Sequence, residues 1–469
     1  MGEEKTRSFL FDTYAGKVEL ETTEDAMTPF GGIVPFAAFL KKTAFLQRLA
    51  STSPVQRTSN NASPVHDILA SFMLTALCDG SRFVHVERLR HDPALARVMG
   101  MESVVSDETI RRFLKVIPER EGREWLAAAA RPLWGALPRQ FILDWDSTVI
   151  TRYGQQEGAV VGYNPHKPGR RSHHPLLAAV ADTRLCAYFR LRPGNEHTAA
   201  EWIDAMEECL EWFGPKHVPW LNRGDKGFGG EEILAWHEKE EGRPHYLFKL
   251  RMTRNVERAM KAIPLEDWQG EHTEGVLQVA EAEIRLSSWS RARRVVFARR
   301  VKKVTPAHKA GTFWEKVEYD FDAYVTDLMP GEANAWQVVE LYNGRGDVEN
   351  VFDELKNHWG LGGFCSRNQV ATEMAARLML LTYNCWNLFL RLMEPGRHVE
   401  AFQGRRWFLL MAARLVESGR ALKAKVSVVG EWWRLVSDGY ERVCAWLVAT
   451  APQLEFGGGK YPALGLPSP

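Results

Sequence analysis

The chain has 469 residues, of which 45% are hydrophobic, and its 60 basic and 59 acidic side chains leave a net charge of +1. This length predicts roughly three domains, and the apolar content suffices for a sizeable core. The 6 cysteines are scattered without a Cys-x-x-Cys pair, which argues against a disulfide framework and against a structural zinc site. We therefore expect a protein of the reducing cytoplasm.

Two features argue against export and membrane insertion. The N-terminus, Met1 to Arg7, lacks the basic-then-apolar order of a signal peptide. The most apolar stretch, Leu378 to Leu390, is interrupted by Asn384 and Asn387, so a core helix explains it better than a membrane span. No membrane partner is expected.

Residues 1–135 are predicted to be mostly helical. A helix is expected from Pro35 to Ala50, then a polar linker at Ser51 to Ser63 and a second helix that ends near Gly80. A third helix is predicted at Ser106 to Lys115, which begins with a favourable N-cap residue and carries acids in its first turn.

The third helix allows two interpretations. Its apolar stripe would pack against a core, while Arg111 and Arg112 would lie elsewhere on its surface. It is either the recognition helix of a helix-turn-helix element, with these arginines facing DNA, or an ordinary packing helix. Amphipathic basic helices are common, so the packing helix is the simpler interpretation.

Residues 136–250 alternate strands and helices, as in a mixed α/β sheet. A buried strand from Phe141 to Thr148 places Asp144 and Asp146 on one face, because side chains alternate along a strand. A second apolar segment, from Val218, runs into Asp225 inside a Gly-rich turn. An Asp at the end of such a segment is commonly a turn or cap residue. Two of them indicate a functional site only together with a third carboxylate.

The segment 251–335 is predicted to be a β-rich insertion. Stretches at Val276 to Leu286, Arg294 to Val301 and Glu315 to Leu328 are rich in Val, Tyr and Phe. The distance from Asp225 to Glu349 is also too long for an ordinary loop.

The most informative motif is Tyr342-x2-Arg345-x3-Glu349-x6-Lys356. At about 100° per residue, one helix would place all four side chains within an arc of roughly 60°. An adjoining apolar sector from Val348 to Leu355 would fix the helix against a core. A carboxylate beside Arg and Lys suits a metal ion and a phosphate chain, although a salt-bridged surface helix has a similar composition.

The weak net charge argues against a DNA-binding protein, because nonspecific affinity comes from Lys and Arg that neutralise phosphates. Two local clusters offset this argument. One, at His166 to His174, contains Arg170 and Arg171, and the other lies at Arg291 to Lys303. A locally positive face is sufficient for DNA binding, although a solvated charged surface gives the same pattern.

Beyond residue 400, apolar helices with basic spots are predicted at Arg405 to Val416 and around Trp432 to Arg434. They close the core or mediate assembly, and the sequence does not choose between these roles.

The Tyr-Arg-Glu-Lys spacing, preceded by an Asp-Ser-Thr strand and an Arg-x-Asp-x-x-Phe segment, resembles the DDE transposases of bacterial insertion sequences. Within them it is similar to the branch related to piggyBac elements, over roughly residues 100–430. The resemblance implies an RNase H-like core whose acidic residues are Asp146, Asp225 and Glu349. We prefer Asp146 to Asp144, because the acid of the family directly precedes a Ser/Thr pair.

The predicted elements and the resemblance together give an α/β fold in five segments. These are a helical N-terminal DNA-binding or assembly domain at 1–135, the first part of an RNase H-like mixed-sheet core at 136–250, a β-rich insertion domain at 251–335, the second part of the core with the Glu349 helix at 336–400, and a C-terminal helical region at 401–469. In related hairpin-forming transposases an inserted aromatic residue can hold a flipped base. Core packing is the simpler explanation for Trp268, Trp289 and Trp314.

The resemblance also implies two Mg²⁺ or Mn²⁺ ions held by Asp146, Asp225 and Glu349. Hard divalent cations prefer oxygen ligands, and two ions roughly 3.5–4 Å apart serve the attacking and leaving oxygens of a phosphoryl transfer. The other residues of the helix motif are expected to contact DNA phosphates near the cut: Tyr342, Arg345 and Lys356. The motifs of Walker-type ATPases, Ser hydrolases and zinc proteases do not occur.

These inferences predict a DNA transposase that binds the terminal inverted repeats of its element, cleaves the strands and transfers the 3′-ends to target DNA. We expect a homodimer on DNA, in the bacterial cytoplasm and associated with the nucleoid. Two alternatives stay open: a non-cleaving DNA-binding regulator derived from a transposase, and an RNase H-like nuclease without strand transfer.

Overall fold

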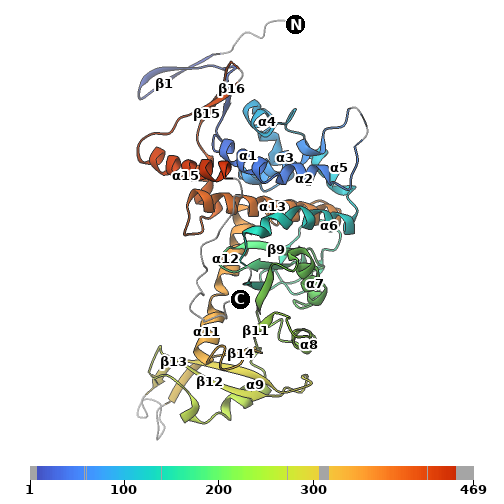
Figure 1. The fold of residues 1–469 in the computed structure, drawn as a ribbon, viewed down its shortest axis with the longest axis vertical. Coiled ribbons are helices and arrows are strands. Elements are labelled where there is room, and N and C mark those ends of the chain that lie inside the picture. The colour runs from blue at the N-terminus through green and yellow to red at the C-terminus, as the bar shows by residue number, and fades with distance from the viewer. Residues whose placement is uncertain are drawn as a thin grey trace.

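The computed structural model describes residues 8–57, 59, 61–138, 140–271, 273–305, 316–419 and 421–449. The molecule is elongated, with packed helices toward one end, a β-rich region at the other and a mixed α/β region between them (Figure 1).

A mixed eight-stranded sheet joins the middle of the molecule to its β-rich end. Its strands are β4 (Gln140–Ser147), β8 (Leu176–Val180), β9 (Leu185–Arg190), β10 (Val218–Gly224), β11 (His245–Lys249), β12 (Leu277–Ile284), β13 (Arg293–Thr305) and β14 (Lys316–Thr326). The strand order is β12-β13-β14-β11-β10-β4-β8-β9. β10 pairs in parallel with both β4 and β11, and the other neighbours are antiparallel. The prediction of a mixed α/β fold is confirmed.

The strands of the segment 251–335 continue this same sheet. β14 pairs with β11 in antiparallel register, so β12, β13 and β14 extend the hydrogen-bonded ladder beyond the parallel strands. Trp268 and Trp289 of this segment are buried, under the guanidinium groups of Arg299 and Arg293 respectively. Trp314 lies outside the described residues.

Helices cover both faces of the parallel strands. Trp145 of β4 packs on Trp202 of α7 (Trp202–Phe213), and α8 (Glu231–Glu238) follows along this face. The opposite face of β4 and β10 packs on α11 (Ala335–Asn343), where Ile142 and Leu221 share one apolar cluster with Val338. Because Trp145 and Asp146 are adjacent in the strand, the acidic side chains face α11 and α12 (Gly346–His358).

The long helix α13 (Gln369–Met393) is almost wholly buried. Asn384, which interrupts its apolar run, bonds the backbone of Cys186 in β9 through both amide atoms, at 2.9 and 2.8 Å. This polar residue therefore fixes the helix against the sheet, as the prediction of a core helix requires. Over the part of the chain that the structure describes, no helix is long and apolar enough to cross a membrane.

The N-terminal part is largely helical, as predicted. Its helices are α1 (Ile33–Lys42), α2 (Phe45–Ser51), α3 (Val65–Leu77), α4 (Pro93–Met99), α5 (Asp107–Lys115) and α6 (Glu119–Ala130), with 3-10 turns at Phe83–Arg88 and Arg131–Ala136. The single helix predicted from Pro35 to Ala50 is wrong, because Ala44 adopts a left-handed conformation with φ 50° and separates α1 from α2.

The remaining elements are small sheets and the C-terminal helices. They are β1 (Phe9–Thr13), β2 (Gly16–Leu20), β3 (Ala26–Thr28), β5 (Ile150–Thr151), β6 (Val160–Val161), β7 (Arg171–His173), β15 (Ala413–Ser418), β16 (Ala421–Val426), α9 (Arg254–Lys261), a 3-10 turn at Leu265–Asp267, α14 (Ala401–Gly404), a π-helical turn at Arg405–Leu409 and α15 (Gly430–Val448). The helix predicted from Arg405 to Val416 is therefore wrong beyond its first turn. Residues 413–416 pair with β16 and with β3 instead.

Candidate functional site

Asp146 and Asp225 lie at the carboxyl ends of two neighbouring parallel strands. In the ladder between β4 and β10, Trp145 is opposite Gly224, so the two acids occupy the next position on each chain. Asp146 accepts a hydrogen bond from the Ser147 N–H at 2.7 Å, and Asp225 accepts one at 2.8 Å from the N–H two residues on. The structure thus brings together two carboxylates that are distant in sequence.

Asp144 has a different environment from Asp146. It is 1% exposed, and both of its carboxylate oxygens accept hydrogen bonds from Arg223, at 2.6 and 2.7 Å. Arg223 also donates to the carbonyl of Leu341 in α11. This buried pair ties β4, β10 and α11 together, and it leaves Asp144 no oxygen that faces an open site.

The helix motif is divided between two helices, which corrects the prediction of one continuous helix. α11 ends at Asn343 and α12 begins at Gly346, so Tyr342 lies on the first helix and Glu349 on the second. At the break the backbone bonds tighten to a spacing of three residues, as between the Arg345 N–H and the Tyr342 carbonyl. Gly344 and Arg345 keep right-handed helical dihedral angles, and the motif residues therefore stay close together.

Arg345 lies between two of the acids. Its Nη2 is 3.0 Å from Asp146 Oδ2 and its Nη1 is 3.7 Å from Glu349 Oε1. The same Nη2 donates to the carbonyl of Trp145 at 3.4 Å. The Arg345 side chain is 7% exposed, whereas that of Glu349 is 72% exposed, so the guanidinium is fixed and the carboxylate is not.

The electrostatics of the site are those of a crowded group of carboxylates. The pKa of Asp146 is raised to about 6, chiefly by burial; the negative charges of Asp225 and Glu349 contribute to this rise, and the charge of Arg345 opposes it. A group with this environment carries its negative charge at a cost, which a cation bound nearby would relieve. The donor set of carboxylate oxygens suits a hard divalent cation.

The Glu349 carboxylate does not lie together with those of Asp146 and Asp225. Among the described residues, no three His, Cys, Asp or Glu side chains meet closely enough to hold a metal ion. Two carboxylates lie at the ends of β4 and β10. The third would require the exposed Glu349 side chain to turn from solvent toward Asp146.

Comparison with known proteins identifies the family. A model of the transposase DDE domain, group 1, matches residues 13–444. The chain belongs to this family. No curated protein sequence matches it. A solved structure, the piggyBac transposase synaptic complex with hairpin DNA, matches 90% of this chain and 82% of its own at 11% identity and a TM-score of 0.41. The predicted DDE transposase family is confirmed.

In this transposase, Tyr342 and Lys356 flank the acids. Tyr342 is 9% exposed and its ring lies 4.6 Å from that of Tyr324 in β14. Burial raises the pKa of the Tyr342 phenol, so it stays neutral and can donate a hydrogen bond. Lys356 lies over the ring of Phe352, and partial burial lowers the pKa of its ammonium group although the nearby Asp146 opposes this shift.

Arg170 and Arg171 are exposed; Arg171 is the first residue of β7 in the small sheet β5-β7-β6, and Arg170 directly precedes it. This sheet follows directly on β4, so it leaves the core at the edge where Asp146 lies. Neither arginine forms an ion pair with another of the described residues. The neighbouring histidines of this cluster do not join the basic surface, because His173 and His174 are buried and burial lowers the pKa of both.

Arg111 and Arg112 are exposed on α5, and both pair with acids of their own helix. Arg111 is 2.7 Å from Asp107, and Arg112 is 2.8 Å from Glu108. The predicted N-cap of this helix is confirmed, since the Ser106 side chain accepts a hydrogen bond from the Thr109 N–H. The apolar stripe of α5 is buried, as a packing helix requires.

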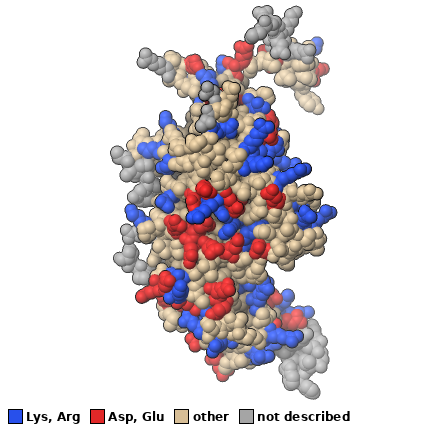
Figure 2. All heavy atoms as spheres, turned by 90° about the vertical axis from the view of Figure 1, so that its right-hand side faces the viewer, with Lys and Arg blue, Asp and Glu red and all other residues tan. Residues whose placement is uncertain are grey.

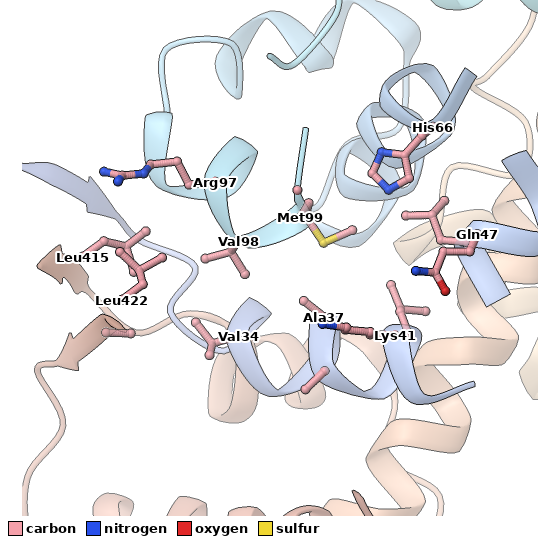
Figure 3. Close-up of a pocket in the computed structure, with 15 residues that line it drawn as sticks. Val34, Ala37, Lys41, Gln47, His66, Arg97, Val98, Met99, Leu415 and Leu422 are labelled. Carbon is pink, nitrogen blue, oxygen red and sulfur yellow. The ribbon is translucent and has the colours of Figure 1, made fainter. Parts of the chain in front are cut away.

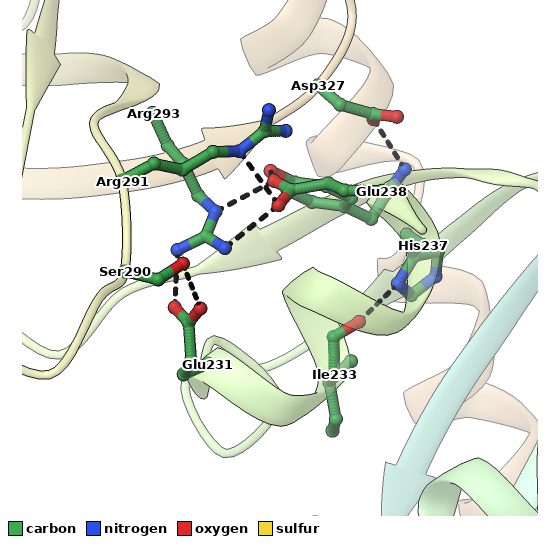
Figure 4. A network of polar contacts seen from close by, with 9 residues as sticks. Glu231, Ile233, His237, Glu238, Ser290, Arg291, Arg293 and Asp327 are labelled. Atoms are coloured by element: carbon green, nitrogen blue, oxygen red, sulfur yellow. Dashed lines mark hydrogen bonds and ion pairs between the residues drawn. The ribbon is translucent and has the colours of Figure 1, made fainter. Parts of the chain in front are cut away.

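Several arginines of the basic cluster at Arg291 to Lys303 face inward, so the positive face predicted there is reduced to exposed residues such as Arg300 and Lys303. Arg293 is buried between Glu231 and Glu238 of α8, and Arg291 reaches the same Glu238 (Figure 4). Two further arginines have internal partners: Arg294 bonds Glu281, and Arg299 bonds Gln278 at 2.8 Å. On the face drawn in Figure 2, acidic side chains gather across the middle with some Lys and Arg among them, and the upper part is mainly basic.

The residue that sequence reasoning missed is Arg223. It lies opposite Asp144 in the β4–β10 ladder, two positions before Asp225, as Asp144 lies two positions before Asp146. One signal in the sequence could have found it. Asp144 and Arg223 carry opposite charges, and each lies two positions before a predicted site acid. The pairing becomes visible only once the two strands are known to be parallel neighbours in this register.

Proposed function

We propose that this transposase is a metal-dependent enzyme that cuts DNA at the ends of its own mobile element and joins the freed 3′-ends to target DNA. Membership of the DDE family makes it a transposase. The observation that carries the finer proposal is the position of Asp146 and Asp225 at the ends of neighbouring parallel strands. In mixed sheets, ligands bind at this edge of the parallel strands.

The strand arrangement supports an RNase H-like core as part of this proposal. The run β9-β8-β4-β10-β11 has an antiparallel meander on one side of β4 and two parallel strands on the other. In this assignment the core comprises segments 136–250 and 336–400, with the β-rich segment 251–335 inserted between them and helical regions at 1–135 and 401–469.

The proposed metal ligands are Asp146, Asp225 and Glu349, for two Mg²⁺ or Mn²⁺ ions. When bound, such ions activate the attacking oxygen and stabilise the leaving oxygen of a phosphoryl transfer. Arg345 holds a positive charge between Asp146 and Glu349, and it therefore limits the repulsion between the acids. Tyr342 and Lys356 are proposed to contact phosphates near the cut, because they lie beside the acids and carry donors.

DNA is the proposed partner, through the terminal repeats of the element and the target. Arg170 and Arg171 are exposed on the segment that follows the Asp146 strand, which favours them for phosphate contacts. Arg111 and Arg112 are proposed as a second contact, but their ion pairs with Asp107 and Glu108 compete with phosphate.

Strand cleavage with a plasmid that carries the DNA flanking the gene tests the proposal. In Mg²⁺ we expect cuts at the element ends with the wild-type protein and none with Glu349→Gln or Asp225→Asn, while all bind the end DNA equally. Asp353→Asn is the matched control, because Asp353 is an exposed acid of the same helix that bonds only Asn357 among the described residues. Cleavage by Glu349→Gln would remove Glu349 from the site.

The same assay separates the alternatives. Products joined covalently to a second DNA distinguish a transposase from a nuclease of the same fold. End-specific binding by the wild-type protein without cleavage in Mg²⁺ or Mn²⁺ would instead indicate a DNA-binding regulator.

A further inference from the structure

The N-terminal hairpin β1–β2 has one apolar face that nothing covers in the described chain. Phe9 is opposite Leu20 and Phe11 is opposite Val18, so these four side chains share a face. They are 55%, 60%, 51% and 46% exposed, respectively. The other face is more polar, since it pairs Asp12 with Lys17 and Leu10 with Glu19.

An isolated hairpin of this kind is marginally stable in water. Every residue of both strands is exposed, and β1 and β2 pair only with each other in the sheets. Figure 1 shows the hairpin projecting beyond the helices at the end of the molecule where the N-terminus lies. The apolar face therefore calls for a packing partner.

The same end of the molecule carries an open groove of complementary character. Its cavity has a volume of about 560 Å³, and it lies between α1, α4 and the β15–β16 hairpin (Figure 3). Val34 and Ala37 of α1 face Val98 of α4 across it, and Leu415 and Leu422 close one end. Val34 and Leu422 are 36% and 45% exposed, so apolar side chains are open to solvent here as well.

The charges of the two surfaces are opposite. Residues 8–24 contain four acids, Asp12, Glu19, Glu21 and Glu24, against the single base Lys17. The groove is lined by Lys41 and Arg97 and by no acid, and Arg97 forms an ion pair with Glu417 of β15. An acidic hairpin is a poor ligand for DNA, because DNA attracts basic surfaces, and it suits this basic, apolar groove.

We propose that the β1–β2 hairpin of one chain packs in the groove of a second copy, and that the exchange is reciprocal. In a twofold arrangement each hairpin fills the groove of the other chain, so no hairpin or groove is left free to bind a third chain. If each of the four side chains buries roughly 100 Å² against an equal area of groove, two exchanged hairpins bury on the order of 1,600 Å², the size of a stable interface. This dimer forms without DNA and goes beyond the proposed cleavage function.

Light scattering coupled to size-exclusion chromatography tests the proposal with the full chain in the low micromolar range. We expect the wild-type protein to be a dimer of the 53.3 kDa chain, and Phe9→Ser/Phe11→Ser to be a monomer with unchanged circular dichroism. Leu10→Ser is the matched control, because Leu10 is 63% exposed on the opposite face of the same strand. It should leave the dimer intact.

A cysteine pair shows where the hairpin packs. Phe11→Cys and Ala37→Cys are made in separate, differently tagged chains, both with the exposed Cys444 replaced by Ser. Mixing them with a short thiol crosslinker should give an adduct of two chains that neither variant gives alone. A wild-type monomer, a dimer unaffected by the Phe9/Phe11 change, or a crosslink only within a chain that carries both cysteines would each overturn the proposal.

Discussion

Asp144 and Asp146 are separated by one residue on the same face of β4, and their surroundings give them opposite roles. The carboxylate of Asp144 is matched by Arg223 in a fully buried pair. The carboxylate of Asp146 is crowded by Asp225 and Glu349, which together with burial raises its pKa. The first acid is part of the framework, and the environment of the second suits the metal-ligand role proposed for it.

Substitution of the two acids should therefore affect stability to different extents. Asp144→Asn leaves the Arg223 charge buried without a counter-charge, and we expect a loss of about 3–5 kcal/mol in the free energy of unfolding. Asp146→Asn removes a charge that the fold holds at a cost, but it also takes an ion-pair partner from Arg345. Because these two effects offset each other, its stability at pH 7 should stay within about 1 kcal/mol of wild type. Urea denaturation at pH 7 measures both.

A double variant that also replaces Arg223, the partner of Asp144, serves as the control. Asp144→Leu/Arg223→Met replaces the whole buried pair by apolar side chains and should recover much of the stability lost in Asp144→Asn. Equal destabilisation by Asp144→Asn and Asp146→Asn would contradict the separate roles.

At the scale of elements, arginines of the basic cluster form internal ion pairs between β13 and α8. We call this set of ion pairs, in which Arg293 and Arg291 bond Glu231 and Glu238, the α8–β13 clasp. Arg293 donates to Glu238 at 2.7 and 2.9 Å and to Glu231 at 2.6 Å (Figure 4). Burial alone would raise the pKa of Glu238, but hydrogen bonds from Arg293, Arg291 and Tyr246 outweigh it and lower the pKa to about 2. The clasp thus joins the β-rich end of the sheet to a helix of the central part.

This shift predicts a pH-dependent contribution to stability. Because the folded-state pKa of Glu238 is about 2 and its ordinary value is 4.5, the stabilisation is complete above pH 4.5 and is lost as the pH falls toward 2. Glu238→Gln should cost about 2–3 kcal/mol at pH 7. The difference in the free energy of unfolding between wild type and this variant, measured by denaturation, should decrease below pH 4.5. A difference independent of pH would refute the lowered pKa of Glu238.

The elements show how far sequence reasoning reaches. The buried strand that ends in Asp146 and the apolar segment before Asp225 were predictable, because alternation and Gly-rich turns are local signals. The break between α11 and α12 was not, since Gly344 and Arg345 keep helical dihedral angles and only the hydrogen-bond spacing changes. The Arg293 clasp was likewise invisible, because local sequence carries no sign that Glu231 and Glu238 lie beside β13.

At the scale of the whole molecule, a net charge of +1 means that DNA binding must rest on local groups. Internal pairing removes Arg293, Arg294 and Arg299 from the candidates. Arg170 and Arg171 remain as an exposed basic pair on the small sheet that follows β4. The residues of the proposed site could be named from their type and order in the sequence, while their relative burial required the fold.

The salt dependence of DNA binding distinguishes the two proposed contact surfaces. Each phosphate neutralised adds about 0.9 to the slope of log K against log salt, so Arg170→Ala/Arg171→Ala should reduce the slope by about 2. Arg111→Ala/Arg112→Ala should reduce it by less, because these arginines already pair with Asp107 and Glu108 and would release fewer counterions. Fluorescence anisotropy with end DNA across a salt series measures both slopes. A larger decrease in slope for Arg111→Ala/Arg112→Ala would indicate that DNA binds along α5. No decrease for either double variant would indicate that DNA binds another face.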